Sequence, residues 1–196
     1  MTTPKPLPTY YKGHVFRSRL EARWAIVFDH LAIPWEYEKE AYKLPSGNYL
    51  PDFWLPTIRG GMWFEVKGQE PTGHETNLAF ELAKTTGADV AVAFGAIPAD
   101  GEDSDYDSAH MHFAPDEWSE DGWDCCYHFQ SCPTCGTVGF EFEDYVGRLP
   151  CRCSYQGHEQ GVSHVKVYNA LEAGRTARFD NGHYNPNPSP ARKWRK

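Results

Sequence analysis

Three charged residues interrupt two short apolar segments, and this pattern constrains the fold more than any other feature of the sequence. Asp52 lies between Leu50 and Phe53, in a segment whose composition is otherwise typical of a strand. Glu65 and Lys67 lie two residues apart in the next apolar segment, so both side chains are expected on one face of a second strand. Because a buried acid needs a partner or a metal ion, the pattern predicts a polar site built on two adjacent antiparallel strands.

The spacing of the apolar residues predicts the surrounding elements. Ser18 is a suitable N-cap for a first helix, with Glu21 three residues later as in a capping box, and Pro34 ends that helix. The order of the elements predicts an α/β domain with a mixed β-sheet flanked by helices. The expected elements after the first helix are strands 35–38, 48–55 and 62–66, a helix 76–86, a strand 89–94 and a last helix at about 165–178.

Two carboxylates and a lysine on neighbouring strands suit the hydrolysis of a phosphodiester. The reaction builds negative charge around phosphorus, and Mg²⁺ or Mn²⁺ held by oxygen ligands stabilises that charge. Asp52, Glu65 and the backbone carbonyl of Val66 would supply the ligands. Lys67 would orient the attacking water or stabilise the developing charge, and Glu21 would touch a second metal ion or a metal-bound water. In the alternative interpretation Glu65 and Lys67 form an ion pair on a solvated face, which leaves Asp52 unexplained.

The first helix and the two strands resemble the PD-(D/E)XK nuclease superfamily. The resemblance rests on the segment from Phe16 to Trp24, on Pro51-Asp52 and on Glu65-Val66-Lys67, in this order. It covers roughly residues 10–97, and it is closest to the branch that includes phage-type Holliday-junction resolvases and the endonuclease subunit of heteromeric transposons. The order of the expected elements also resembles the restriction-endonuclease-like core of that family.

The resemblance implies a Mg²⁺-dependent endodeoxyribonuclease that acts in phage or mobile-element DNA processing or recombination. Asp52 and Glu65 would be the metal ligands, Lys67 the catalytic lysine and Glu21 the helical acid that many members carry. All four positions hold the expected residue types, so nothing in the motif indicates an inactive enzyme. Resolvase-like relatives tend to act as dimers, so the expected partners besides DNA are a second copy of the chain or another protein of a phage or mobile-element machinery.

Two close pairs of cysteines predict a small zinc-ribbon-like module. Cys132 and Cys135 form a CxxC turn followed by glycine, and Cys151 and Cys153 form a CxC. Four thiolates suit a structural Zn²⁺ ion, whose closed coordination shell would not activate water. Three further candidates, for which core or spare side chains are the simpler interpretation, are Cys125, Cys126 and His128.

The acidic residues are concentrated in one segment. The net charge of the chain is −8, yet residues 71–125 alone carry thirteen Asp/Glu against one Lys/Arg, so both flanking segments are mildly basic. This distribution weakens the objection that an acidic protein avoids DNA. The segment 99–124 is expected to be an acidic loop or linker, either simply solvated or covering the DNA cleft. The residues expected to contact DNA are Lys12, Arg17, Arg19 and Gln69, and the cation-rich residues 192–196 are either a further contact or a solvated end.

These features divide the chain into four expected segments: a nuclease core 1–98, an acidic linker 99–124, a zinc-ribbon-like module 125–160, and a C-terminal helix with a basic tail 161–196. A metal-dependent DNA endonuclease is the expected function. Two alternatives stay open, a non-catalytic DNA-binding protein that keeps the fold and a zinc-ribbon interaction protein within a larger DNA-processing complex. Without an apolar run of roughly 18 residues or an apolar leader, a cytoplasmic protein that does not contact the membrane is expected.

Overall fold

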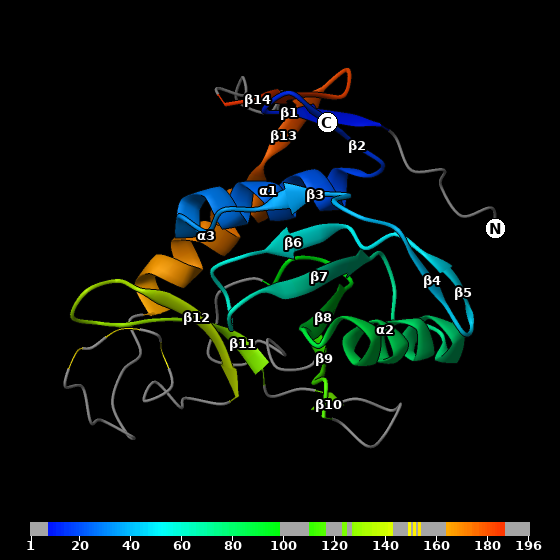
Figure 1. Cartoon of the computed structure of the whole chain (residues 1–196). Helices are drawn as coiled ribbons and strands as arrows, with labels where there is room; N and C mark the ends of the chain where they lie inside the picture. Colours follow the sequence, from blue (N-terminus) through cyan, green and yellow to red (C-terminus); the bar gives the residue numbers. More distant parts are fainter. Residues whose placement is uncertain are drawn as a thin grey trace.

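A six-stranded mixed sheet lies at the centre of the protein (Figure 1). The structure is a computed structural model and describes residues 8–98, 110–116, 123–124, 127–142, 149, 151, 153 and 164–186. The strand order is β10-β9-β8-β7-β6-β3; β7 and β8 run parallel and the other neighbours antiparallel, so the sheet is mixed, as predicted. The strand bounds are Glu36–Tyr37 (β3), Phe53–Leu55 (β6), Met62–Lys67 (β7), Asp89–Phe94 (β8), His110–Phe113 (β9) and Trp123–Asp124 (β10).

Helix α1 (Arg19–Leu31) covers one face of the sheet, and α3 (His164–Thr176) packs against α1. The predicted N-cap is confirmed, because Ser18 accepts a hydrogen bond from the backbone N–H of Glu21. The Glu21 carboxylate does not complete a capping box; it accepts instead from the N–H of Arg17. The two helices cross so closely that a Cβ atom on Gly174 would lie 2.8 Å from the carbonyl oxygen of Arg23. Glycine is therefore required at this crossing.

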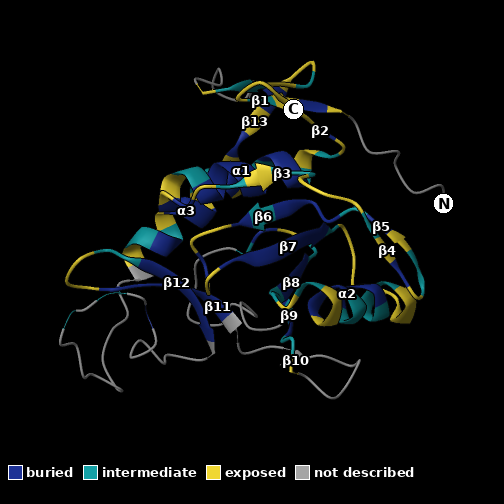
Figure 2. Cartoon of the chain, in the orientation of Figure 1, coloured by how far each residue is buried: buried dark blue, intermediate teal, exposed yellow. Residues whose placement is uncertain are grey.

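The face of β7 that α1 covers belongs to the larger of the two main hydrophobic cores. Phe64 packs against the rings of Trp24 and Phe28 with centroids 4.9 and 5.1 Å apart. Met62 and Val66 lie in the same core, so Val66 points inward as expected. Figure 2 shows that β7 and β8 are buried along most of their length.

The opposite face of the sheet is covered by α2 (Gly73–Thr86) and by a separate hairpin of β4 (Tyr42–Leu44) and β5 (Gly47–Tyr49). Trp63 of β7 packs into this second core. Side chains alternate along a strand, so Glu65 and Lys67 share the face of Trp63 and look away from α1. This alternation decides which residues can meet in the candidate site.

Segments from near the two ends of the chain pair in a second sheet that lies beside α1 (Figure 1). Its order is β13-β14-β1-β2, from Thr9–Tyr11 (β1), His14–Phe16 (β2), Arg178–Asp180 (β13) and His183–Asn185 (β14). β1 and β14 are parallel, and the rings of Tyr10 and His183 stack across them with centroids 4.5 Å apart. The sequence did not predict the β13–β14 hairpin that follows α3.

The cysteine-bearing hairpin of β11 (Tyr127–Ser131) and β12 (Val138–Phe142) is joined to the main core. Phe129 and Phe140 are fully buried in the same cluster as α1 and β7. Arg59, between β6 and β7, pairs with Asp89 at 3.0 Å and with Glu141 of β12 at 3.2 Å. The hairpin is therefore tied to the sheet by apolar packing and by this ion-pair network.

Two expected elements are wrong. Residues 48–55 do not form one strand, because the chain bends at Asp52, and β5 and β6 on either side of the bend belong to different sheets. Residues 110–113 and 123–124 are not loop; they form β9 and β10 and extend the main sheet beyond β8. The acidic composition around β9 concealed its buried residues, which include His112 and Phe113. Residues 99–109 and 117–122 of the acidic segment lie outside the described residues.

Each helix in the described residues is too short or too polar to span a membrane.

Candidate active site and metal centre

Asp52 lies at the bend that leads into β6 and is buried, with 2% of its surface exposed. Its Oδ2 atom accepts a hydrogen bond of 2.8 Å from the backbone N–H of Val66. Its own backbone N–H donates to Glu65 Oε2 at 3.1 Å. Because β6 and β7 are hydrogen-bonded neighbours, these two bonds fix the two carboxylates against each other at the end of the strand pair. The predicted meeting of Asp52 and Glu65 therefore occurs, although Asp52 comes from a bend rather than from within a strand.

Lys67 lies between two carboxylates. Its Nζ atom is 2.9 Å from Glu65 Oε1 and 3.2 Å from Glu75 Oε1. Glu75 also forms a complete capping box with Thr72 at the start of α2, so its position is fixed by the helix. The helix predicted at 76–86 begins three residues too late and therefore leaves out Glu75. The signal was present, since a threonine followed three residues later by a glutamate marks the start of a helix.

Asp52 and Glu65 carry more negative charge than a buried site readily holds. Burial raises the pKa of Asp52 well above its usual range, and the charges of Glu65 and Glu21 raise it further. Burial also raises the pKa of Glu65, against the opposing effect of Lys67. Burial alone would lower the pKa of Lys67, but Glu65 and Glu75 reverse this, so the ammonium stays charged. A further cation beside the two buried carboxylates would relieve their repulsion.

Tyr49 is a further member of the site that the sequence analysis missed. It is 8% exposed, and its hydroxyl group makes no hydrogen bond of normal geometry in the described part of the chain. Burial raises the pKa of Tyr49, and so do the nearby charges of Glu65 and Asp52. The hydroxyl group also has Glu65 within reach as a hydrogen-bond acceptor, so Tyr49 adds a buried polar group to the site. Its place on β5 depends on how the hairpin docks on α2, which no local pattern predicts.

Arg17 contacts carboxylates of this site and is also partly exposed to solvent. Its guanidinium group pairs with Asp52 through Nη2, and its Nε atom lies 2.9 Å from Glu38 Oε1. About half of the side chain, 52%, stays exposed. The charge of Asp52, together with Tyr37 and Glu21, outweighs burial and raises the pKa of Arg17.

Glu21 is buried but reaches the site only from the side of α1. Its Oε2 atom accepts from the Tyr37 hydroxyl at 2.6 Å and from the Arg17 N–H at 3.1 Å. Glu65 faces the other side of the sheet, so the three carboxylates do not converge on one point. Among the described residues, only the four cysteines place three or more possible metal-ligand atoms within 4.8 Å of one another. Glu21 is therefore better placed to hold Arg17 than to share a metal ion with Glu65.

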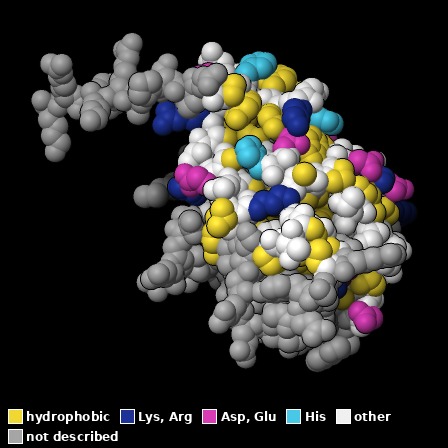
Figure 3. All heavy atoms as spheres, turned by 90° about the vertical axis from the view of Figure 1, so that its left-hand side faces the viewer, with side chains coloured by type: hydrophobic (Ala, Val, Ile, Leu, Met, Phe, Trp, Pro, Cys, Tyr) yellow, Lys and Arg dark blue, Asp and Glu magenta, His cyan; other side chains and the backbone are white. Residues whose placement is uncertain are grey.

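The other residues expected to contact DNA lie on the surface and have separate environments. Lys12 forms an ion pair of 2.9 Å with Asp29, which also accepts from Tyr11, so it anchors the first hairpin to α1. Arg19 and Gln69 are exposed. On the face drawn in Figure 3, basic side chains are scattered among apolar, acidic and histidine side chains rather than gathered in a stripe. Residues 192–196 lie outside the described chain.

The four predicted cysteines meet at the tip of the β11–β12 hairpin. The Sγ atoms of Cys132, Cys135, Cys151 and Cys153 all lie within 4.8 Å of one another, close enough to bind one metal ion. The turn is closed by a hydrogen bond of 2.8 Å from the Gly136 N–H to the Cys132 carbonyl, and Gly136 has the left-handed φ of 72° that favours glycine. Cys125 and Cys126 lie outside the described residues, and His128 is buried in β11 away from this group.

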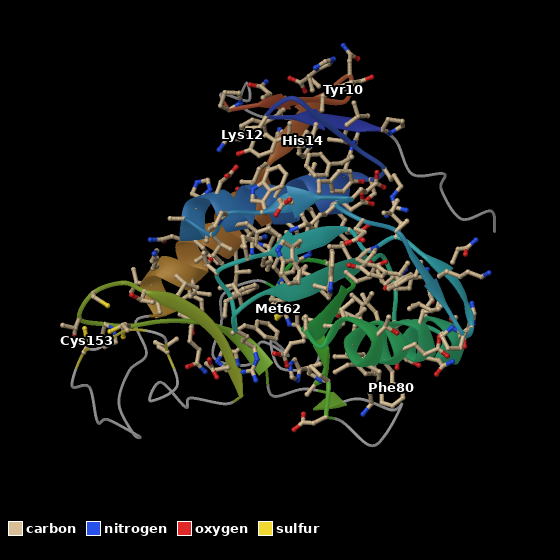
Figure 4. The ribbon with its side chains drawn as sticks, viewed as in Figure 1. Tyr10, Lys12, His14, Met62, Phe80 and Cys153 are labelled. Carbon is tan, nitrogen blue, oxygen red and sulfur yellow. The ribbon has the colours of Figure 1, made fainter. Side chains whose placement is uncertain are left out.

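The electrostatics of the cysteine group also favour a cation. Hydrogen bonds from Thr137 lower the pKa of Cys135 to about 6, so this sulfur is largely a thiolate at neutral pH. The neighbouring Cys135 in turn raises the pKa of Cys153 to about 12. Four thiols that repel one another in this way ionise together only around a metal ion. Figure 4 shows Cys153 on the side of the molecule away from Phe80 of α2, so this group is separate from the site around Lys67.

Comparison with family models, with curated proteins and with solved structures finds no match for this chain.

Proposed function

We propose that this protein is a metal-dependent DNA endonuclease that hydrolyses phosphodiester bonds at Asp52, Glu65 and Lys67. The observation that carries the proposal is the pairing of two buried carboxylates from neighbouring chain segments with a charged lysine on the same strand. A structural ion pair would require Lys67 and Glu65 alone. It would not account for Asp52, whose buried charge is only partly balanced by Arg17.

The residues of the site fit a hard divalent cation such as Mg²⁺ or Mn²⁺. Asp52, Glu65 and the carbonyl oxygen of Val66 would hold it, since such ions prefer oxygen ligands. The buried hydroxyl group of Tyr49 lies beside these carboxylates. When bound, the ion would polarise the scissile phosphate and lower the pKa of a bound water.

The chain's own residues would orient the reactants. Lys67, held between Glu65 and Glu75, is placed to hydrogen-bond the attacking water or a phosphate oxygen. In the hydrolysis the water oxygen bonds to phosphorus and the bond to the leaving sugar oxygen breaks. The proton of the water passes to solvent or to a carboxylate, and the leaving oxygen takes up a proton from solvent to become a hydroxyl group. The order α1, β3, β6, β7, α2, β8 also agrees with the order expected from the PD-(D/E)XK resemblance, and this agreement supports the proposal of a restriction-endonuclease-like fold.

The most direct assay uses supercoiled plasmid and a synthetic four-way junction with Mg²⁺, Mn²⁺ or EDTA. We expect metal-dependent cutting that Asp52→Asn and Lys67→Ala abolish. The matched controls Asp116→Asn and Lys43→Ala, both at exposed positions, should cut like the wild type. Binding of DNA without cutting under every metal would favour the alternative of a non-catalytic DNA-binding protein.

We propose separately that the four cysteines hold a structural Zn²⁺ ion, because tetrahedral thiolate sites are typical of zinc and the group is remote from the carboxylates. The separate four-cysteine site favours a second role of the protein as an interaction module. Purified protein should contain about one zinc per chain, and Cys132→Ser should lose it. Cys126→Ser is the control and should keep the metal; zinc-free wild-type protein would remove this proposal.

A further inference from the structure

Both carboxylate oxygens of Asp52 are already engaged. Oδ2 accepts from the backbone N–H of Val66, which the ladder of β7 and β8 holds in place. Oδ1 accepts from the guanidinium group of Arg17. A cation that binds Asp52 through Oδ1 would meet the guanidinium group of Arg17 at that atom.

Arg17 is built to leave this position without unfolding its surroundings. Its backbone N–H is anchored to Glu21 Oε2 at 3.1 Å and faces the Tyr37 hydroxyl at 3.2 Å, so the main chain stays in place. Its side chain is half exposed, and its Nε atom already contacts Glu38 at 2.9 Å. The guanidinium group can therefore turn from Asp52 toward Glu38 and solvent by side-chain rotation alone.

We propose that Arg17 is the internal counterion of this site: a divalent cation displaces it from Asp52, and the released guanidinium group then holds a DNA phosphate. The inference rests on the proposed nuclease function and adds a positioning residue to it. A guanidinium group and a divalent cation on one carboxylate oxygen repel each other strongly where little water screens them. Once released at the exposed rim of the site, the guanidinium can bind a phosphate through two parallel hydrogen bonds.

Two consequences follow from this exchange. Arg17 and the metal ion compete for Asp52, so removing Arg17 should tighten metal binding when DNA is absent. The released Arg17 also holds a DNA phosphate, so the same change should slow cutting when the metal ion is saturating. Effects of opposite sign are not expected from a residue that only stabilises the fold, because local unfolding would weaken both.

The test is a calorimetric titration of Mn²⁺ into the full-length protein without DNA. We expect Arg17→Gln to bind Mn²⁺ roughly tenfold more tightly than the wild type, a typical size for coupling between two ligands of one site. Arg17→Lys, which keeps a positive charge but cannot hold Asp52 and Glu38 together, should tighten binding less. Arg178→Gln on the exposed face of β13 is the control for loss of a positive charge and should change nothing.

In the cleavage assay at saturating Mn²⁺, Arg17→Gln should be slower by roughly tenfold or more, in line with the loss of a charged hydrogen bond to phosphate. Circular dichroism checks that the variant is folded, and Arg17→Lys decides the question if Arg17→Gln is not. Unchanged or weaker Mn²⁺ binding in a folded variant overturns the inference, while a wild type that binds Mn²⁺ and cuts DNA keeps its proposed function. If neither the wild type nor Arg17→Gln binds Mn²⁺, the proposed function itself fails and the inference fails with it.

Discussion

At the scale of single residues, Asp52 is the group whose ionisation the fold opposes most clearly. It is enclosed on all sides, and burial together with Glu65 and Glu21 raises its pKa. The folded protein therefore holds the Asp52 proton more tightly than the unfolded chain, in which an aspartate titrates near pH 4. The stabilisation from this proton is complete below that pH and is lost as the pH rises through the raised pKa.

This linkage predicts how Asp52→Asn changes stability in the absence of metal. With EDTA at about pH 8, we expect the variant to melt about 2–4 °C above the wild type, which corresponds to roughly 1 kcal/mol for a chain of this size. The amide can still accept from the Val66 N–H, and it removes a buried charge that Arg17 balances only in part. The difference should shrink as the pH falls through the raised pKa of Asp52, because the carboxyl group then regains its proton. Melting curves of the two proteins that shift in parallel with pH would contradict this account of Asp52.

A second prediction concerns the helix residue that holds Lys67. Glu75→Gln keeps an oxygen acceptor for Thr72 but removes the charge beside the ammonium group. Since Glu75 is one of the groups that raise the pKa of Lys67, its loss should lower that pKa. We expect the alkaline limb of the cleavage profile to move to lower pH. The exposed Glu70→Gln provides the control, and an identical profile for both variants would show that Glu75 acts only as a helix cap.

The residues on β7 could be predicted from the sequence because strand alternation alone places Glu65 and Lys67 together. Asp52 was identified by the misfit of an acid in an apolar segment, although its backbone was wrongly assigned to a strand. Glu75 and Tyr49 could not be assigned to the site in this way, because each reaches it through the docking of α2 or of the β4–β5 hairpin. A short sequence pattern does not predict contacts between elements of this kind.

At the scale of elements, the crossing of α1 and α3 is the most sharply constrained contact. A Cβ atom on Gly174 would lie 2.8 Å from the Arg23 carbonyl oxygen and 2.5 Å from Val27 Cγ2. We expect Gly174→Ala to destabilise the protein by about 2 kcal/mol, as overpacking usually does, although alanine favours a helix. Gly73→Ala at the start of α2, where a Cβ would meet nothing within 4 Å, should leave stability unchanged or raise it. Chemical denaturation measures the free energy of unfolding of both variants. Equal values would mean that the crossing of α1 and α3 accommodates the added methyl group without strain.

The elements with a regular apolar pattern were the ones that could be predicted. α1, β7 and β8 have such patterns, and their boundaries differ from the predicted ones by a residue or so. β9 was missed because its four residues are His110, Met111, His112 and Phe113 within an acidic segment, where composition outweighed burial. Of the two buried histidines there, His112 contacts Asp89 of β8 at 2.9 Å, and His110 packs against the ring of Trp24 on α1.

At the scale of the whole molecule, the second sheet joins segments from near both ends of the chain. Phe179 and Tyr184 pack toward α1, and β14 pairs with β1. Removing residues 178–196 should therefore lower the melting temperature by several degrees, since it exposes apolar surface on α1 and breaks the pairing of β1. Removing only residues 187–196, which follow β14, is the control. Equal melting temperatures for the two truncated proteins would show that this sheet does not support the core.

This long-range pairing could not be predicted, because β1 and β14 lie more than 160 residues apart and each is three residues long. The joining of the cysteine hairpin to the main core is a similar case. Phe129 and Phe140 are ordinary strand residues in sequence. Their place in the core becomes clear only in the fold, where Phe129 packs on Phe28 and Phe64 and Phe140 packs on Phe129.

In the proposed function, the carboxylates at the end of β6 and β7 act with a bound metal ion to hydrolyse DNA. The single-turnover rate of plasmid cutting with Mg²⁺ tests it most directly when Glu65→Gln is compared with Glu70→Gln. The first variant keeps one side-chain oxygen, which can accept from either Lys67 or the Asp52 N–H, and loses the charge that would hold the metal. We expect its rate to fall at least about 100-fold, while the exposed Glu70→Gln stays within about twofold of the wild type. Metal-dependent cutting by Glu65→Gln at the wild-type rate would contradict the assignment of the active site.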